Sequence, residues 1–275
     1  MQVLLLGHPV DHSLSPVMQN AAFAAAGLPH RYHVRDVEPE DIEAAVADLR
    51  AQDCLGANVT VPHKLAVIPG LDSLDAESET LGAVNTIVNV DGRLEGHNTD
   101  VEGVWRGLLE PVLESVGDAH IVLAGAGGGA RAVMAALGRI LVDAPGTVVV
   151  VARSVDEAAR VAALGAGFGI STGAGAWDEM AEACEGAQVL VNCTPLGLHG
   201  EDPFAGVSLT GRVALDLGYA AGGTPLIRRA RAEGATRAVQ GDQMLLHQGA
   251  EGFRLWTGQE PPIEAMALAL SEAIG

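Results

Sequence analysis

The sequence predicts a two-domain α/β protein in which short strands alternate with helices and pair into mostly parallel sheets. Short apolar runs, such as 3–7 and 121–124, are each followed by a segment of helical length. Alternation of this kind gives parallel, doubly wound sheets. The 275 residues suffice for one or two hydrophobic cores, and the 48% of apolar residues is typical of a globular chain. The pattern changes character at His120, which indicates a second domain.

The first hundred residues are predicted to form strand–helix units with one antiparallel excursion. Ser15 followed by Pro16 is typical of a helix N-cap with proline in the first turn, and Pro62 also suits a first helical turn. Asp91-Gly92 predicts the turn of a hairpin. The expected strands are 3–7, 32–37 and 55–61, and the expected helices are 15–26, 39–51, one that starts at 62, and 100–117.

From His120 onward, the alternation predicts a Rossmann-type sheet followed by two helices at the end of the chain. A helix is expected after each of the first two strands of this part. The expected strands are 121–124, 148–152, 188–192 and 212–217, and the expected terminal helices are 243–257 and 262–274.

The charge balance narrows the classes of partner. A net charge of −19 argues against binding to nucleic acid or to an anionic membrane. No apolar run is long enough to span a bilayer, and the start MQVLLLG lacks the basic region of a signal peptide. The cysteines at 54, 184 and 193 form neither a metal-binding nor a disulfide pattern. We therefore expect a cytoplasmic protein with a small-molecule ligand and no metal site.

A glycine loop at 125–130 predicts dinucleotide binding. The pattern Gly125-x-Gly127-x-x-Ala130 follows a strand and opens a helix, which is the context that makes it specific. Gly125 permits the tight turn, Gly127 lets the pyrophosphate approach the backbone, and Ala130 lets the helix pack closely. The expected cofactor-binding residues of the loop are Gly125, Ala126, Gly127, Gly128, Gly129 and Ala130.

The end of the next strand favours NADP over NAD. An acidic residue there would bind the ribose 2′-hydroxyl of NAD. The chain has Arg153 and Ser154 instead, which can meet a 2′-phosphate by charge and by hydrogen bond. The structural alternative is an ordinary solvated arginine at a helix start.

Lys64 is the only lysine in a chain that otherwise uses arginine for every cationic side chain. A lysine can exchange a proton where an arginine cannot. Asp100 can pair with it, and several short polar side chains follow strands or introduce helices nearby. Taken singly, each has a structural explanation as a cap or turn residue, but together they suit a small polyhydroxylated ligand. The set is Ser13, Ser15, Asn58, Thr60, Lys64, Asn85, Asn98, Thr99 and Asp100.

Several of these segments resemble motifs of the shikimate dehydrogenase family, in the same order along the chain. The segment 12–16 (HSLSP) is similar to the family's serine signature, and 58–64 (NVTVPHK) to its catalytic-lysine signature. The segments that resemble the later substrate-binding, cofactor and closing motifs are 82–86, 98–100, 125–131, 216–219 and 241–248.

The resemblance implies a role for each matching residue. Lys64 with Asp100 would handle the proton at the substrate C3 oxygen during hydride transfer. Ser13 and Ser15, with Tyr219, would hold the substrate carboxylate. The residues implied around the ring hydroxyls are Asn58, Thr60, Asn85, Asp100 and Gln248. The cofactor contacts implied outside the glycine loop are Arg153, Ser154, Thr194, Leu217 and Gly241.

The resemblance also implies an activity and a domain organisation. The activity is reversible NADPH-dependent reduction of 3-dehydroshikimate to shikimate, a step of chorismate and aromatic amino-acid biosynthesis. Residues 1–100, completed by helices in 243–275, would bind substrate, and 101–242 would bind NADP. Assembly as a homodimer stays open. The alternatives are a quinate or dual quinate/shikimate dehydrogenase able to use NAD, and a non-catalytic small-molecule sensor.

Two positions depart from the family pattern. Gln19 stands where a histidine is usual, and we interpret the change as structural because it lies inside the first helix. Glu157 stands where NADP-type members carry a second basic residue, although Arg160 follows one turn later. The second departure weakens the prediction of NADP as the cofactor but leaves the prediction of a dehydrogenase unchanged.

Overall fold

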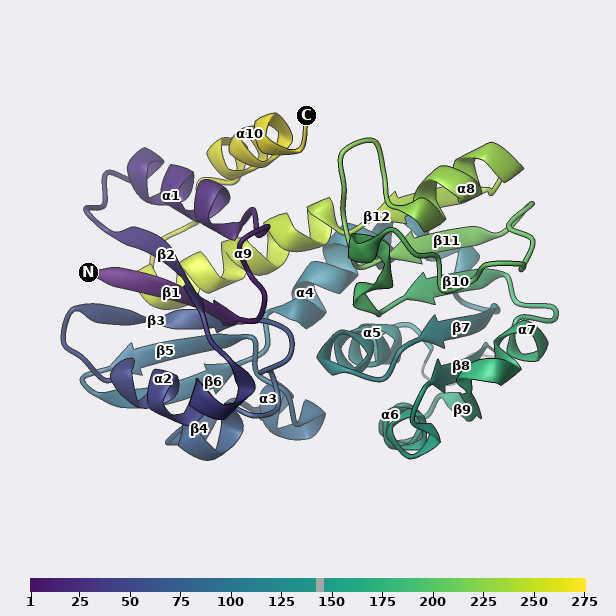
Figure 1. Ribbon diagram of the computed structural model, residues 1–275, viewed down its shortest axis with the longest axis horizontal. Helices are drawn as coiled ribbons and strands as arrows, with labels where there is room; N and C mark the ends of the chain where they lie inside the picture. Colours follow the sequence, from purple (N-terminus) through teal and green to yellow (C-terminus); the bar gives the residue numbers. More distant parts are fainter. Residues whose placement is uncertain (142–145) are drawn as a thin grey trace. The chain divides into compact units, whose positions relative to one another are not determined.

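The structure is a computed structural model that describes residues 1–141 and 146–275 (Figure 1). The described chain divides into two compact units. One combines Met1–Asp100 with Leu245–Gly275, and the other is Val101–Met244. Each unit contains its own six-stranded sheet. The predicted α/β class with mostly parallel sheets is confirmed.

The sheet of the first unit combines parallel ladders with a hairpin. Its strands are β1 (Gln2–Gly7), β2 (Arg31–Asp36), β3 (Cys54–Val59), β4 (Ser73–Leu74), β5 (Thr86–Val90) and β6 (Arg93–His97), in the order β2-β1-β3-β5-β6-β4. β1 pairs in parallel with β2 and β3, and β4 with β6, whereas β5 is antiparallel to β3 and β6. Asp91 and Gly92, both with positive φ, form the predicted hairpin turn.

Alternating side chains of β1 enter two apolar cores on the two faces of this sheet. Val3 and Leu5 join a cluster with helices α1 (Ser15–Ala25), α9 (Asp242–Thr257) and α10 (Ile263–Ile274). Leu6 instead joins a cluster with α2 (Ile42–Asp48). A strand buried on both faces requires apolar residues at successive positions, as in the run 3–6.

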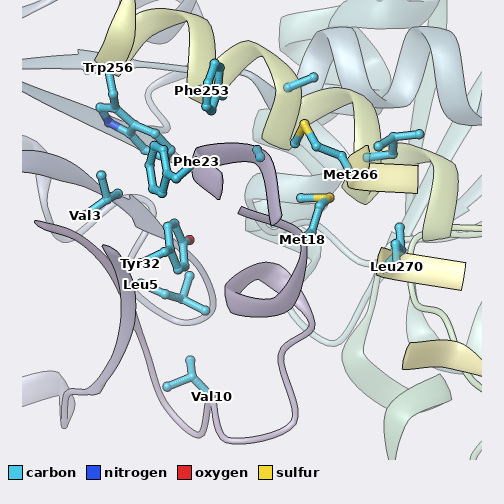
Figure 2. Packing of buried hydrophobic residues seen from close by; sticks show 13 residues of the cluster. Val3, Leu5, Val10, Met18, Phe23, Tyr32, Phe253, Trp256, Met266 and Leu270 are labelled. Carbon is cyan, nitrogen blue, oxygen red and sulfur yellow. The ribbon is translucent and has the colours of Figure 1, made fainter. Parts of the chain in front are cut away.

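Aromatic packing anchors the end of the chain to its beginning (Figure 2). The rings of Phe23 on α1 and Phe253 on α9 have centroids 5.5 Å apart, and those of Tyr32 and Trp256 are 6.2 Å apart. Phe23 and Phe253 are fully buried, and burial of such a side chain contributes about 1.5–3 kcal/mol. Trp256 Nε1 also donates to the carbonyl oxygen of Ile87 at 3.0 Å. These contacts fix α9, whose residues contribute to the candidate site below.

Arg50, which follows α2, ties the hairpin to the loop before β4. Its Nη1 donates to Asp72 Oδ2 at 2.5 Å and to the Gly92 carbonyl at 2.8 Å, and its Nη2 donates to the Gly70 carbonyl at 3.0 Å. Asp72 Oδ2 also accepts the N–H of Leu94 at 2.7 Å. The hydrogen bond from Arg50, followed by that from Leu94, holds the pKa of Asp72 below its ordinary value.

We expect Asp72→Asn to lower the melting temperature by about 1–3 °C at neutral pH. A carboxyl with a lowered folded-state pKa contributes stability above its unfolded pKa, about 4, and loses that contribution as the pH falls through the folded value. The difference between wild type and variant should therefore be steady above about pH 5 and should shrink below about pH 4. Thermal unfolding followed by circular dichroism measures it, and a difference that persists unchanged into acid contradicts the prediction.

Two local predictions for this unit are wrong. Helix α1 has Leu14 at its N-cap and begins at Ser15, so Ser15 is a first-turn residue and not the cap. The helix predicted from Pro62 does not form, and turns lead instead to the 3₁₀ helix Ile68–Gly70. Pro69 lacks the backbone N–H that a continuous α-helix from Pro62 would need at that position. The unit also contains the 3₁₀ helix Pro39–Asp41, directly before α2, and the α-helix α3 (Ala76–Leu81).

The second unit has a fully parallel sheet with the strand order of a Rossmann fold. Its strands are β7 (His120–Ala124), β8 (Thr147–Ala152), β9 (Ser171–Ala176), β10 (Val189–Asn192), β11 (Val213–Asp216) and β12 (Arg237–Gln240), in the order β12-β11-β10-β7-β8-β9. The order reverses between β7 and β10, and sheets of this kind bind ligands at such a switch point. The helices are α4 (Asp100–Val104), α5 (Gly128–Gly138), α6 (Val155–Gly167), α7 (Met180–Ala183) and α8 (Pro225–Glu233).

The second half of the chain differs from expectation in two respects. The helix predicted over 100–117 is interrupted: α4 passes into the π-helix Trp105–Leu109 and then into the 3₁₀ helix Glu110–Ser115. Pro111 lies at this change and cannot donate the backbone hydrogen bond that a continuous helix requires. Strands β9 and β12 were not predicted, because the sequence STGAGA of β9 lacks an apolar run and β12 is short and partly polar.

The cysteines of the described chain are free. Burial raises the pKa of the Cys184 thiol to about 11, which keeps it protonated at neutral pH. Among residues 1–141 and 146–275, no helix is both long and apolar enough to cross a membrane.

Candidate active site

Strand direction brings four chain segments to one edge of the first sheet. β1, β3 and β6 end at this edge, and the antiparallel β5 begins there: Asn58 pairs with Thr86, and Thr86 with His97. Leu6, near the end of β1, pairs with Val59 at the end of β3. The loops after β1, β3 and β6 and the residue before β5 therefore lie together, at the position where α/β sheets bind ligands.

Lys64 and Asp100 form an ion pair at this edge. Lys64 Nζ lies 2.5 Å from Asp100 Oδ2, and the two side chains are 15% and 5% exposed. The other carboxylate oxygen accepts from Asn85 Nδ2 at 2.9 Å, and the Asp100 N–H donates to Asn98 Oδ1 at 3.1 Å. An ammonium group has three donors, so Lys64 keeps N–H groups for a ligand oxygen while Asp100 holds its position.

Uncharged side chains form a buried network next to the pair. Tyr32 donates its hydroxyl to Asn58 Oδ1 at 2.7 Å, and Asn58 Nδ2 donates to Thr86 Oγ1 at 3.0 Å. The hydroxyls of Thr86 and Thr99 lie 3.1 and 3.2 Å from Asn85 Oδ1. All five residues are buried. The network therefore fixes the orientation of the Asn85 amide without adding charge.

The Asn85 amide nitrogen has more acceptors than hydrogens. It lies 2.9 Å from Thr99 Oγ1, 2.9 Å from Asp100 Oδ1 and 3.3 Å from Gln248 Oε1. Since the nitrogen carries two hydrogens, it cannot satisfy all three at once. Gln248 has the longest contact, and its own Nε2 donates to the Leu245 carbonyl at 3.0 Å. Gln248 Oε1 is therefore the member of this group best able to accept from a ligand hydroxyl.

We expect Tyr32→Phe to destabilise the protein by about 1 kcal/mol, because Asn58 Oδ1 then loses its hydrogen-bond donor in a buried position. Tyr32 is 2% exposed, so water does not readily replace the hydroxyl. The predicted fall in melting temperature is about 2–4 °C. Thermal and urea unfolding measure the change, and a variant as stable as wild type would show that Asn58 finds another donor.

The other predicted substrate residues lie on neighbouring loops. Ser13 Oγ accepts the N–H of Ser15 at 3.3 Å, and Ser15 is buried. A Cβ atom at Gly7 would lie 2.3 Å from Thr60 Cγ2, so the loop carrying Thr60 lies against the end of β1. Within the described residues, none of these three side chains hydrogen-bonds to Lys64 or Asp100. Tyr219 belongs to the second unit, in the loop after β11.

In the second unit, the glycine loop connects β7 to α5 at the switch point of the sheet. Gly125 has φ +106°, and a Cβ there would come within 2.9 Å of Thr194 Cγ2 after β10. Gly127 is exposed, and a Cβ there would meet no atom within 4 Å, so the space in front of the α5 N-terminus is open. Helix N-termini with open access bind phosphate groups. Ala130 is fully buried, which lets α5 pack closely. The loop therefore fits a dinucleotide pyrophosphate.

Thr194, Leu217 and Gly241 lie at the carboxyl ends of β10, β11 and β12, on the same edge as the glycine loop. Thr194 Oγ1 donates to Asn192 Oδ1 at 2.6 Å, and the Gly241 N–H donates to the Gly218 carbonyl at 2.9 Å. Their positions match a ligand that crosses the switch point of a parallel sheet.

A buried carboxylate organises this edge. Asp216 is fully buried; its Oδ1 accepts from Asn192 Nδ2 and from the Gly218 N–H, each at 2.9 Å, and its Oδ2 accepts the Thr224 hydroxyl at 2.7 Å. Burial raises the pKa of Asp216, with these hydrogen bonds acting in the opposite direction. Because Asn192 also fixes Thr194, Asp216 links the ends of β10 and β11.

Arg153 and Ser154 follow β8 and are exposed. Ser154 is the N-cap of α6 and accepts the Glu157 N–H at 3.3 Å. Within the described residues, Arg153 makes no hydrogen bond or ion pair and so has a guanidinium free to meet an anion. Glu157 is paired with Arg160.

Sequence reasoning overlooked Tyr32, Thr86 and Asp216 as members of these networks. Tyr32 and Thr86 lie within strands, where a polar residue facing a polar neighbour has the same sequence pattern as one facing solvent. Asp216 stands at the end of an apolar strand, which was a usable signal for a buried carboxylate. Gln19 is buried in α1 and donates from Nε2 to the Gly249 carbonyl at 2.8 Å, consistent with the structural interpretation.

Comparison with known families agrees with the motifs. The family model described as "Shikimate dehydrogenase substrate binding domain" matches residues 5–87, and that described as "Shikimate 5'-dehydrogenase C-terminal domain" matches residues 243–270. The chain is 43% identical, over 284 residues, to the shikimate dehydrogenase (NADP(+)) of Moorella thermoacetica, covering 99% of this chain and 93% of the relative.

Solved structures extend the likeness to the fold. The shikimate 5-dehydrogenase of Thermus thermophilus, in complex with NADP(H) and shikimate, has a TM-score of 0.78 at 33% identity and covers 99% of both chains. The quinate dehydrogenase of Corynebacterium glutamicum, in complex with NAD, has a TM-score of 0.84 at 30% identity and also covers 99% of both. With a curated relative 43% identical across nearly its whole length, the chain belongs to the shikimate dehydrogenase family.

Proposed function

We propose that the protein is an NADP-dependent oxidoreductase that interconverts 3-dehydroshikimate and shikimate, a step of chorismate and aromatic amino-acid biosynthesis. The observation that carries the proposal is the Lys64–Asp100 pair, 2.5 Å long and mostly buried within a set of uncharged hydrogen-bonding side chains. Such a set suits a ligand rich in hydroxyls, and the paired amine suits a proton-transfer step. Relatives named shikimate dehydrogenase (NADP(+)) support the same substrate and cofactor.

The two units would bind different ligands. The first, Met1–Asp100 with Leu245–Gly275, would hold the substrate, and the second, Val101–Met244, would hold NADP through the glycine loop, Arg153 and Ser154. Thr194, Leu217 and Gly241 would line the cofactor at the ends of their strands. Bound NADP supplies hydride exchange with the carbon that carries the reacting oxygen.

Lys64 would act as the general acid or base for the reacting hydroxyl. Its ammonium group, held by Asp100, would donate a hydrogen bond to that oxygen and give it a proton as the carbon is reduced. In the direction of oxidation, the neutral amine would take the hydroxyl proton. Asp100 would fix the direction of the amine, because its second oxygen is already bonded to Asn85. The protein thus orients the substrate oxygen for proton transfer while hydride exchange takes place at the carbon.

The neutral side chains would orient the rest of the substrate. Ser13 and Ser15, with Tyr219, would donate to the carboxylate, which suits a chain whose net charge of −19 disfavours anions. The residues assigned to the ring hydroxyls are Asn58, Thr60, Asn85, Asp100 and Gln248.

We further propose that the enzyme works in the cytoplasm and forms a homodimer. The free cysteines fit a reducing compartment. The dimer proposal rests on β2 being an edge strand of the first sheet, with β1 as its only strand neighbour among the described residues. Sedimentation velocity on the purified protein tests it.

Initial rates of nicotinamide reduction test the activity. Shikimate and quinate are each assayed with NADP⁺ and with NAD⁺. Turnover with shikimate and NADP⁺ well above the other pairings supports the proposal. Comparable turnover with quinate or NAD⁺ would place the protein with the broader dehydrogenases, and binding of shikimate without turnover in any pairing would make it a sensor.

A further inference from the structure

Two arginines pair with one carboxylate in the first turns of α6, and a third arginine stands in the sequence just before that helix. Glu157 forms ion pairs with Arg160 one turn further along α6 and with Arg131 of α5, whose Nη2 lies 3.9 Å from Glu157 Oε2. Arg153, at the end of β8, is exposed and has no ion-pair partner among the described residues. The cluster thus contains three cations, two of which already share one internal anion.

The cluster lies where the adenosine ribose of a bound dinucleotide is expected. In a Rossmann unit, the residues that follow the second strand face the ribose of the adenosine half. β8 is the second strand of this unit counted from β7, and Arg153 and Ser154 follow it. A 2′-phosphate placed there would lie close to Arg153 and to the first turn of α6, of which Glu157 is the third residue.

We propose that Glu157 is a specificity-determining residue, which competes with the cofactor's 2′-phosphate for Arg131 and Arg160 and so weakens the preference for NADP over NAD. This inference rests on the proposed function, because it assumes that a dinucleotide binds at the glycine loop. Glu157 acts in two ways: its negative charge repels the phosphate, and its ion pairs hold two guanidinium groups that the phosphate would otherwise engage. NAD lacks the phosphate, so neither effect acts on its binding.

The test is the binding affinity of NADP⁺ and NAD⁺, measured by isothermal titration calorimetry on the intact protein without substrate. We expect Glu157→Gln to lower the Kd for NADP⁺ at least about fivefold, a modest share of what a charged contact contributes, and to change the Kd for NAD⁺ less than twofold. Asp156→Asn is the matched control. It removes the same charge from the same first turn of α6, and so reproduces any effect on the helix dipole. We expect it to change both Kd values less than twofold.

A second pair of variants separates this inference from the function on which it rests. Arg153→Ala should weaken NADP⁺ binding and spare NAD⁺. If Arg153→Ala weakens NADP⁺ while Glu157→Gln leaves it unchanged or weakens it, the cofactor assignment stands and Glu157 is not a competitor. If neither Arg153→Ala nor Glu157→Gln changes the Kd for NADP⁺, the 2′-phosphate binds elsewhere. The assignment of Arg153 to the phosphate and the role of Glu157 as its competitor then both fail. In an Arg160→Ala background the gain from Glu157→Gln should shrink, since one of the released cations is absent.

Discussion

Replacement of Lys64 by methionine is expected to lower kcat for shikimate oxidation about 10³-fold, in the range that general acid–base groups contribute. Methionine preserves the unbranched apolar stem of the side chain but carries no proton. Asp100 keeps its hydrogen bond from Asn85, so the surrounding network should hold its shape. Steady-state rates with NADP⁺ give kcat, and calorimetry with shikimate shows whether binding survives within about tenfold of wild type.

Lys64→Arg is the control that separates charge from proton transfer. Arginine keeps a cation beside Asp100 but stays protonated at any ordinary pH. We therefore expect it to lose nearly as much turnover as the methionine variant. If Lys64→Arg retains close to full kcat, the pair supplies only electrostatic stabilisation, and the proton must travel by another route.

The second large effect concerns stability. We expect Asp216→Leu to destabilise the second unit by on the order of 3 kcal/mol, because the Asn192 amide, the Thr224 hydroxyl and the Gly218 N–H all lose their acceptor inside the fold. Leucine branches at the same atom and is not smaller than aspartate, so the substitution leaves no cavity and the loss reflects the missing acceptor. Urea unfolding measured by fluorescence and circular dichroism gives the free energy, and a loss below about 1 kcal/mol would mean that water or rearrangement satisfies the donors.

Asp216→Asn is the matched control for Asp216→Leu, and the pH dependence of its effect on stability tests the raised pKa of Asp216. Asparagine still accepts hydrogen bonds at one oxygen, and its amide can donate to Thr224, so we expect a loss under about 1 kcal/mol at neutral pH. Because burial raises the folded-state pKa of Asp216, the carboxyl contributes stability that is full below its unfolded pKa and is lost as the pH rises through the raised value. The advantage of wild type over Asp216→Asn should therefore grow as the pH falls. An advantage that shrinks in acid would contradict the raised pKa.

Much of this fold could be predicted from the apolar runs in the sequence and from the turn residues that separate them. The apolar runs at 3–7 and 121–124 are strands because they are buried on both faces, and such strands need no alternation to be recognised. Asp91-Gly92 predicted its turn because few residues adopt positive φ readily. The glycine loop was predictable for the same reason, since its function depends on backbone geometry.

Other features depend on contacts that local sequence does not encode. Lys64 was singled out by being the only lysine, yet the predicted helix around it is absent, and its position is set by Asp100 far along the chain. Tyr32 belongs to the site through a bond to Asn58, and nothing in strand β2 distinguishes it from a core tyrosine. Strand β9 forms because β8 pairs with it, although its own residues have little strand propensity.

The surplus of acceptors around the Asn85 amide bears on how the enzyme would tell its substrate from near relatives. Two hydrogens face three oxygens, so at any moment the Asn85 amide leaves one of these acceptors without its hydrogen bond. A ligand with a hydroxyl at that point donates a hydrogen bond to this acceptor. An analogue that lacks only this hydroxyl would leave the acceptor without a donor and would also keep water from reaching it. Sites built in this way reject deoxy analogues more strongly than larger ones, by factors that reach about 10⁴. Selectivity of this kind arises from an imbalance between donors and acceptors in the protein's own side chains.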